Sequence, residues 1–96
     1  MQSLATVPTD KAVRYMTQLC KHWSHRFEVA FDDKAGRIAL PLGSCTLTAG
    51  PAALDIVLDA ADTEGLTKME QVVADHLNRF AFREGELVYD WTHTAG

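Results

Sequence analysis

The stretch from Phe27 to Asp59, FEVAFDDKAGRIALPLGSCTLTAGPAALDIVLD, decides the fold. Apolar residues recur at every second position in four successive runs, which is typical of strands with one buried face. The connections between the runs are short and contain Gly or Pro, as turns do. We therefore predict four consecutive antiparallel strands, with these apolar positions: Phe27, Val29 and Phe31; Ile38, Leu40 and Leu42; Cys45, Leu47 and Ala49; Leu54, Ile56 and Leu58.

An amphipathic helix is predicted on each side of this stretch. The first has Thr9 as its N-cap, Asp10 in its first turn and an end near residues 22–24. The second begins near residue 62 or 63 and runs to about Arg79. Each helix has a single apolar stripe at helical spacing: Ala12, Met16, Leu19, Cys20 and Trp23 in the first, and Leu66, Met69, Val73, His76, Leu77 and Phe80 in the second.

Two outer strands complete the predicted architecture, at residues 3–7 and 87–91. Two helices with one apolar stripe each cover only one face of a sheet. We therefore predict one α+β domain over residues 1–96, a two-layer sandwich. A largely antiparallel sheet of about six strands carries both helices on one face. The order β-α-β-β-β-β-α-β is similar to that of TATA-box-binding-protein-like folds, a comparison that concerns fold alone.

The predicted uncovered face of the sheet is polar and mainly acidic, with small apolar residues interspersed. It admits two interpretations: a solvated surface, or a partner surface through which the chain forms a homodimer. Its predicted residues are Glu28, Ala30, Asp32, Arg37, Ala39, Thr46, Thr48, Asp55, Val57, Asp59, Glu86, Val88 and Asp90.

Composition narrows the classes of function. The formal net charge of -4 and the absence of basic clusters disfavour nucleic acid and anionic membranes as partners. The first twenty residues lack the apolar core of a secretory signal, so we expect a cytoplasmic protein with Cys20 and Cys45 as free thiols. A chain of 96 residues is too short for a (β/α)8 barrel, which needs about 250.

The segment Cys20-Lys21-His22-Trp23-Ser24-His25 concentrates a thiol, two imidazoles and an indole at the end of the first helix. Cys20 lies on the apolar stripe and is expected to point into the core. His22 and His25 have an alternative role, since cationic groups complement the dipole at a helix C-terminus. The spacing Cys-x-His-x2-His matches no standard zinc motif.

His76 is the most informative polar residue of the second helix, because it lies on the apolar stripe. It is either a core histidine with a hydrogen-bonded ring or a functional group with a perturbed environment. If the two helices run parallel, their C-terminal ends meet at one edge. The predicted ligand-binding residues are then His22, Trp23, His25, His76, Arg79 and Arg83, a set suited to an anion.

Two alternatives use the same residues. His22, His25 and His76 are candidate ligands of a metal or a haem. His76 is also a candidate general acid or base, which requires a pocket and a second titratable group within hydrogen-bond reach. Catalytic residues and cofactors are otherwise unspecified by the sequence, and no Gly-rich phosphate loop is found.

Several stretches resemble the bacterial family called domain of unknown function 2218. They are Arg14-Tyr15, residues 21–25, Gly43-Ser44-Cys45 and residues 72–84 (VVADHLNRFAFRE), and the resemblance covers essentially the whole chain. Asn78 departs from the pattern, which has a charged residue there. The resemblance implies a small bacterial protein found alone or joined to siderophore-interacting proteins, the flavin reductases of ferric siderophores. An aldolase label that some members carry conflicts with the chain length.

These observations rank four hypotheses. The first is a non-catalytic accessory or ligand-binding module in iron or siderophore metabolism, whose partner is a siderophore-interacting reductase or a small anionic ligand. The second is the metal- or haem-binding module, and the third is a small acid–base enzyme. The fourth is a dimeric interaction module built through the open sheet face.

Overall fold

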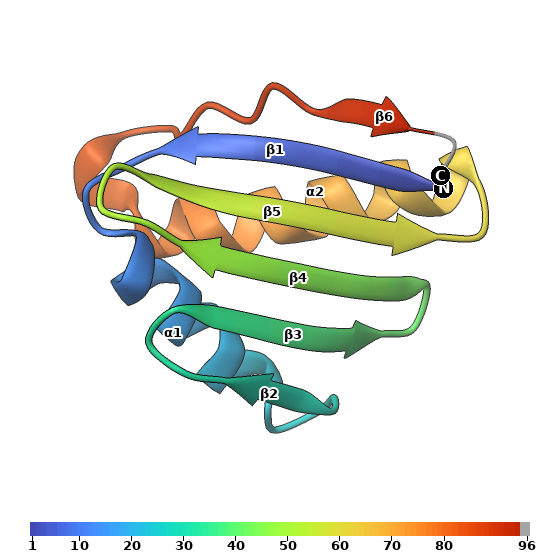
Figure 1. The fold of residues 1–96 in the computed structure, drawn as a ribbon, viewed down its shortest axis with the longest axis horizontal. Helices are drawn as coiled ribbons and strands as arrows, with labels where there is room; N and C mark the ends of the chain where they lie inside the picture. Colours follow the sequence, from blue (N-terminus) through green and yellow to red (C-terminus); the bar gives the residue numbers. More distant parts are fainter. Residues whose placement is uncertain (95–96) are drawn as a thin grey trace.

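The computed structural model describes residues 1–94 as one sheet backed by two helices (Figure 1). In chain order the elements are β1 (Gln2–Pro8), α1 (Ala12–Trp23), β2 (Val29–Phe31), β3 (Ala35–Leu40), β4 (Gly43–Ala49), β5 (Ala53–Ala60), α2 (Thr63–Phe80), a short 3-10 helix η1 (Phe82–Glu84) and β6 (Thr92–Thr94).

The sheet has six strands in the order β2-β3-β4-β5-β1-β6, and every neighbouring pair is antiparallel. Strands β2 to β5 form the predicted meander. The first strand then lies beside β5, and β6 pairs with its other side and forms the edge of the sheet. Both helices lie behind the same face of the sheet (Figure 1). The predicted α+β two-layer architecture is confirmed.

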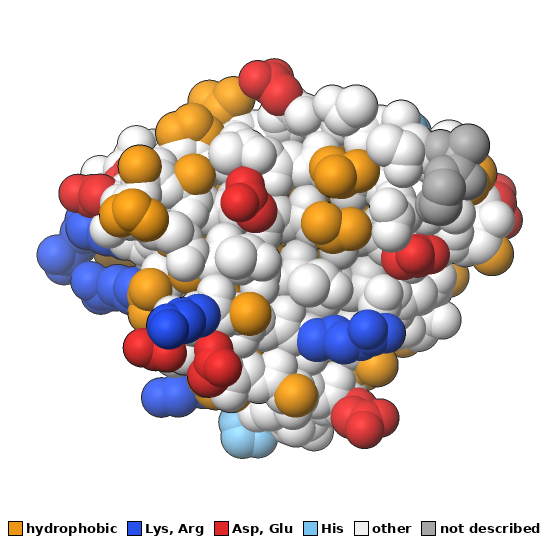
Figure 2. All heavy atoms as spheres, in the orientation of Figure 1, with side chains coloured by type: hydrophobic (Ala, Val, Ile, Leu, Met, Phe, Trp, Pro, Cys, Tyr) orange, Lys and Arg blue, Asp and Glu red, His pale blue; other side chains and the backbone are white. Residues whose placement is uncertain are grey.

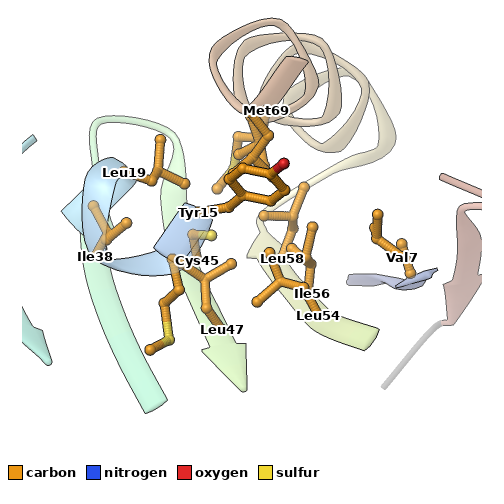
Figure 3. Packing of buried hydrophobic residues seen from close by; sticks show 14 of the residues in the cluster. Val7, Tyr15, Leu19, Ile38, Cys45, Leu47, Leu54, Ile56, Leu58 and Met69 are labelled. Atoms are coloured by element: carbon orange, nitrogen blue, oxygen red, sulfur yellow. The ribbon is translucent and has the colours of Figure 1, made fainter. Parts of the chain in front are cut away.

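One layer of apolar side chains fills the space between helices and sheet (Figure 3). The stripe of α1 supplies Met16, Leu19 and Cys20, all fully buried, and the alternating positions of the strands face them. Cys20 and Cys45 are free thiols in this core. Burial raises the pKa of Cys20 to about 11 and that of Cys45 to about 12. Both therefore stay protonated at neutral pH and behave as small hydrophobes.

The start of α1 differs from the prediction. The helix begins at Ala12, the N-cap position belongs to Lys11 without a side-chain cap, and Asp10 lies before the first turn. Thr9 is used differently: its hydroxyl accepts a hydrogen bond from the backbone N–H of Lys11 at 3.1 Å and donates to Glu84. Thr9 thereby links the turn after β1 to η1 instead of capping the helix.

The last strand was predicted at residues 87–91, and this position is wrong. The strand that pairs with β1 is β6, whose three residues lie opposite Gln2 to Leu4. Residues before it are held on α2 by Asn78, whose side-chain oxygen accepts from the backbone N–H of Leu87 at 3.2 Å and from the Tyr89 hydroxyl at 3.1 Å. The alternation at 87–91 therefore reflects packing against a helix and not pairing in a sheet.

The uncovered face of the sheet has the predicted polar character. Arg37, Thr48, Asp55 and Asp59 are exposed on it. Acidic, basic and apolar side chains are interspersed across it, with no continuous apolar area (Figure 2). Glu28, Glu86, Val88 and Asp90 lie outside the strands. A homodimer through this face remains a prediction.

Gly43 offers a direct test of the sheet register. A Cβ atom at this position would lie 1.8 Å from the backbone oxygen of Asp59 on β5, whereas at Gly50 the nearest atom would be 3.4 Å away. We expect Gly43→Ala to lower the free energy of unfolding by about 2–3 kcal/mol, because backbone must move to admit the methyl group. Gly50→Ala is the matched control and should change it by less than about 0.5 kcal/mol. Urea unfolding measures both, and equal effects would contradict the register.

Tyr15 is expected to reduce the stability of the fold at alkaline pH. Its side chain is buried and its hydroxyl bonds to Glu84 at the edge of the core, and burial, followed by that hydrogen bond, raises its pKa from 10.0 to about 12. Below pH 10 the phenol is neutral in both the folded and unfolded states. Between pH 10 and 12 the unfolded state loses the proton first, so the free energy of unfolding falls as pH rises. Tyr15→Phe should lose less stability than the wild type over this range in urea unfolding; identical losses would show that Tyr15 does not contribute.

Candidate functional site

A pocket of about 290 Å3 opens between the end of α1, the middle of α2 and the turn that joins β3 to β4. Most of its wall is apolar, and its floor includes the buried side chains of Trp23 and Met69. Leu42, predicted as a strand residue, lies instead in the β3–β4 turn and is exposed at the pocket. The lining residues are His22, Trp23, Arg26, Phe27, Leu40, Pro41, Leu42, Lys68, Met69, Val72 and His76.

The end of α1 places two of these side chains. The backbone N–H groups of Arg26 and Phe27 both donate to the carbonyl oxygen of Trp23, at 3.0 and 2.8 Å. These bonds close a turn directly after the helix, so that Arg26 and Phe27 lie at the pocket. The Arg26 guanidinium carbon lies 5.7 Å from the centre of the Phe27 ring, a cation–π contact.

His76 is half-buried and makes one defined hydrogen bond. Its Nδ1 lies 2.7 Å from the carbonyl oxygen of Val72, one turn earlier on α2. A carbonyl oxygen only accepts, so Nδ1 carries the proton. In the neutral ring Nε2 is then an acceptor directed away from the helix backbone. Among residues 1–94 no protein group bonds to that nitrogen.

Three aromatic rings meet at His76. The centre of its ring lies 5.0 Å from that of Trp23 and 5.3 Å from that of His22, with interplanar angles of 53° and 48°. The His22 ring also packs edge-on against Phe80 at 6.3 Å. These tilted contacts are within the range of favourable aromatic pairs. They fix His76 between the two helices, at the wall of the pocket.

Every ionisable side chain that lines the pocket is basic: His22, Arg26, Lys68 and His76. Lys68 has an acidic neighbour, Glu64, at 3.6 Å. Both side chains of that pair are exposed, and an exposed ion pair at this spacing contributes little. The pocket therefore has a positive lining in a chain whose formal net charge is -4.

Half of the predicted ligand-binding residues meet in this pocket. His22, Trp23 and His76 line it, whereas His25, Arg79 and Arg83 do not. The reason is the direction of the helices. They run in roughly opposite directions and at an angle (Figure 1), and the start of α1 lies near η1, which follows α2 and whose Glu84 bonds to Tyr15 and Thr9. The end of α1 consequently faces the middle of α2.

Arg26 and Lys68 were not predicted as site residues. Arg26 directly follows the His22–His25 cluster, but only the turn after Trp23 shows that it folds back. Lys68 had a signal in the sequence. It precedes Val72 and His76 at successive spacings of four, which places the three residues on one side of a helix.

The alternatives raised by the sequence need specific arrangements of side chains. In the part of the chain that the structure describes, no group of three or more His, Cys, Asp or Glu side chains is arranged to hold a metal ion. His22 and His76 are neighbours, but His25 does not line the pocket. Within residues 1–94 no second titratable side chain is hydrogen-bonded to His76, so the acid–base role stays a hypothesis.

A separate polar cluster joins β1, α2 and β6. Glu70 accepts from the Ser3 hydroxyl at 2.5 Å and lies 2.6 Å from Nε2 of His93. The residue types are those of a hydrolase triad, but the carboxylate stands between serine and histidine, and Ser3 is fully buried. Ser3 has no histidine beside it and no access to a substrate, so the cluster does not have the arrangement of a hydrolase triad. The cluster instead fastens β6 to the edge of the sheet.

Comparisons with known proteins agree with the fold. The chain belongs to the family described as "Uncharacterized protein conserved in bacteria (DUF2218)", which matches residues 4–92. It is similar to a solved structure described as "NMR structure of PA4090 from Pseudomonas aeruginosa", with 38% sequence identity, a TM-score of 0.80 and coverage of 95% of this chain and 94% of that chain. No curated protein matches. No helix within residues 1–94 is long and apolar enough to cross a membrane.

The hydrogen bond of His76 predicts its tautomer. We expect the neutral ring to carry its proton on Nδ1, the less common form in solution, because the Val72 carbonyl accepts that proton. Long-range nitrogen–proton NMR correlations of the imidazole distinguish the two forms. The exposed ring of His25, for which the structure gives no such bond, is the internal control. A neutral His76 with its proton on Nε2 would contradict the geometry.

Proposed function

We propose that this domain is a non-catalytic binding module for a small anionic molecule, which it holds in the pocket beside His76. The observation that carries the proposal is the positive charge of the side chains that line the pocket. Arg26 and Lys68 give the pocket positive charge, two histidines accompany them and no carboxylate lines it, although Asp and Glu outnumber Lys and Arg by thirteen to nine in the chain. An anion is the ligand charge that this lining favours.

The physical setting strengthens such an interaction. Arg26 and Lys68 are exposed at the mouth, and a ligand that fills the apolar interior displaces water beside them, which strengthens a charge interaction. Arg26 offers a planar guanidinium that matches a carboxylate with two parallel hydrogen bonds. Its cation–π contact with Phe27 restrains the side chain before the ligand arrives, which reduces the entropy lost on binding.

The size of the pocket limits the ligand. About 290 Å3 lies just below the roughly 300–1,000 Å3 common for small-molecule sites. A whole ferric siderophore exceeds this space, whereas one acidic arm or a precursor fits. Following the family resemblance, we propose iron or siderophore handling as the setting and a siderophore-interacting reductase as a partner. Binding of a metal or haem at His22, His25 and His76 is the alternative to which the structure gives least support.

Arg26 tests the proposal. We expect Arg26→Gln to weaken binding of a carboxylate ligand about tenfold, equivalent to ~1.4 kcal/mol, because a charge-assisted bond is lost. Arg79→Gln is the matched control: it removes the same charge from an exposed position outside the pocket. Titrations with acetate, benzoate, citrate and phosphate, followed by amide chemical shifts, give the dissociation constants and locate the binding site.

Two results would overturn the proposal. In the first, none of the four anions shifts the amide signals of the pocket residues. In the second, Arg26→Gln and Arg79→Gln weaken binding equally, which would mean that the anions sense only the overall charge. Folding of both variants is checked in the same spectra, since signals far from the substituted residue should not move.

A further inference from the structure

The pocket distinguishes among anions by more than charge. We infer that its ligand is a hydroxylated aromatic acid with a single ring, whose hydroxyl group bonds to His76 and whose carboxylate meets Arg26. This inference rests on the proposed function, because it names the class of anion that the same pocket takes. Three separate observations carry it: the aromatic wall, the acceptor on His76 and the position of the cations.

The wall of the pocket favours a flat ring. Trp23, His22 and Phe27 contribute aromatic surfaces, and Met69 also lines the pocket. The Trp23 and Phe27 rings are 6.2 Å apart at 71°, so the wall presents both faces and edges. A ligand ring inserted here makes offset or edge contacts with several of them, and a sulfur–aromatic contact with Met69. Leu40 and Val72 complete an apolar enclosure.

His76 then selects a hydroxyl group. Its Nδ1 proton is already given to the Val72 carbonyl, so the neutral ring has only the Nε2 lone pair to offer. A carboxylate or an ether oxygen brings no proton and cannot satisfy an acceptor. A phenolic hydroxyl does bring one, and its bond to Nε2 replaces the water that an acceptor at a pocket wall otherwise binds.

The cations lie toward the mouth. Arg26 and Lys68 are exposed, whereas His76 is half-buried against Trp23. Lys68 already forms an ion pair with Glu64, so Arg26 is the principal partner of the ligand's carboxylate. The third side of the pocket, formed by the end of β3 and the β3–β4 turn, contributes Leu40, Pro41 and Leu42 and no charge. A hydroxyl inside and an acid outside correspond to opposite ends of one ring, as in 4-hydroxybenzoate.

Four probes separate these contributions. 4-Hydroxybenzoate has all three features, benzoate lacks the hydroxyl, 4-hydroxybenzamide lacks the charge, and 4-hydroxycyclohexanecarboxylate lacks the aromatic ring. Dissociation constants come from amide chemical shifts of the wild-type chain. We expect 4-hydroxybenzoate to bind at least fivefold more tightly than each of the other three and to shift signals of residues 22–27, 40–42 and 68–76.

Two variants assign the contacts. His76→Phe keeps an aromatic ring and removes the acceptor, so it should reduce the affinity for 4-hydroxybenzoate to that for benzoate and leave benzoate unchanged. Arg26→Gln should weaken both acids and spare 4-hydroxybenzamide. The comparison of probes on the wild type remains decisive even if a variant fails to fold.

The results of these titrations distinguish a failure of this inference from a failure of the proposed function. If citrate or acetate binds in the pocket as tightly as 4-hydroxybenzoate, the aromatic class is wrong and anion binding stands. If benzoate and 4-hydroxybenzoate bind equally, the role of His76 as acceptor is wrong. If no anion of either panel shifts the signals of the pocket, both the inference and the proposed function fail.

Discussion

A sheet with a single covered face is the constraint on which the rest of this structure depends. Both helices must bury their apolar stripes on the same face of the sheet, α1 over β2 to β5 and α2 over β1 and β5. They meet at an angle instead of lying side by side (Figure 1). Where α1 ends against the middle of α2, Trp23 and His76 fill part of the wedge between them. The unfilled remainder is the pocket, so the site is a consequence of how the two layers fit.

Most of the fold was predictable because its signals are local. In β3, β4 and β5 alternate side chains face the helices, as predicted, whereas in β2 Val29 is half-buried and Phe31 is exposed. The misplaced last strand shows the limit of that reasoning. Residues 87–91 alternate as a strand does, yet Asn78 binds the Leu87 backbone and the Tyr89 hydroxyl and keeps this segment on α2. Alternation reports a half-buried extended chain and does not reveal which surface buries it.

Only part of the site could be predicted from the sequence, for a related reason. His22, Trp23 and His76 stood out because each is an unusual residue on or beside an apolar stripe. Whether they meet Arg79 and Arg83, or instead Arg26 and Lys68, depends on the direction of α1 relative to α2. That direction is set by contacts distant in sequence, such as those of Thr9 and Tyr15 with Glu84. No periodicity within one helix contains such information, so the charged half of the site required the structure.

The positive charge of the pocket lining contrasts with the acidic composition of the whole chain. The chain of 96 residues has thirteen acidic residues, and none of them lines the pocket. An acidic surface repels anions at long range, an effect that salt screens within about 10 Å. Inside an apolar pocket the nearest charges dominate, and these are basic. The protein therefore discourages anions over most of its surface and favours them at one place, a distribution that suits selective binding of a small anion better than adhesion to a polyanion.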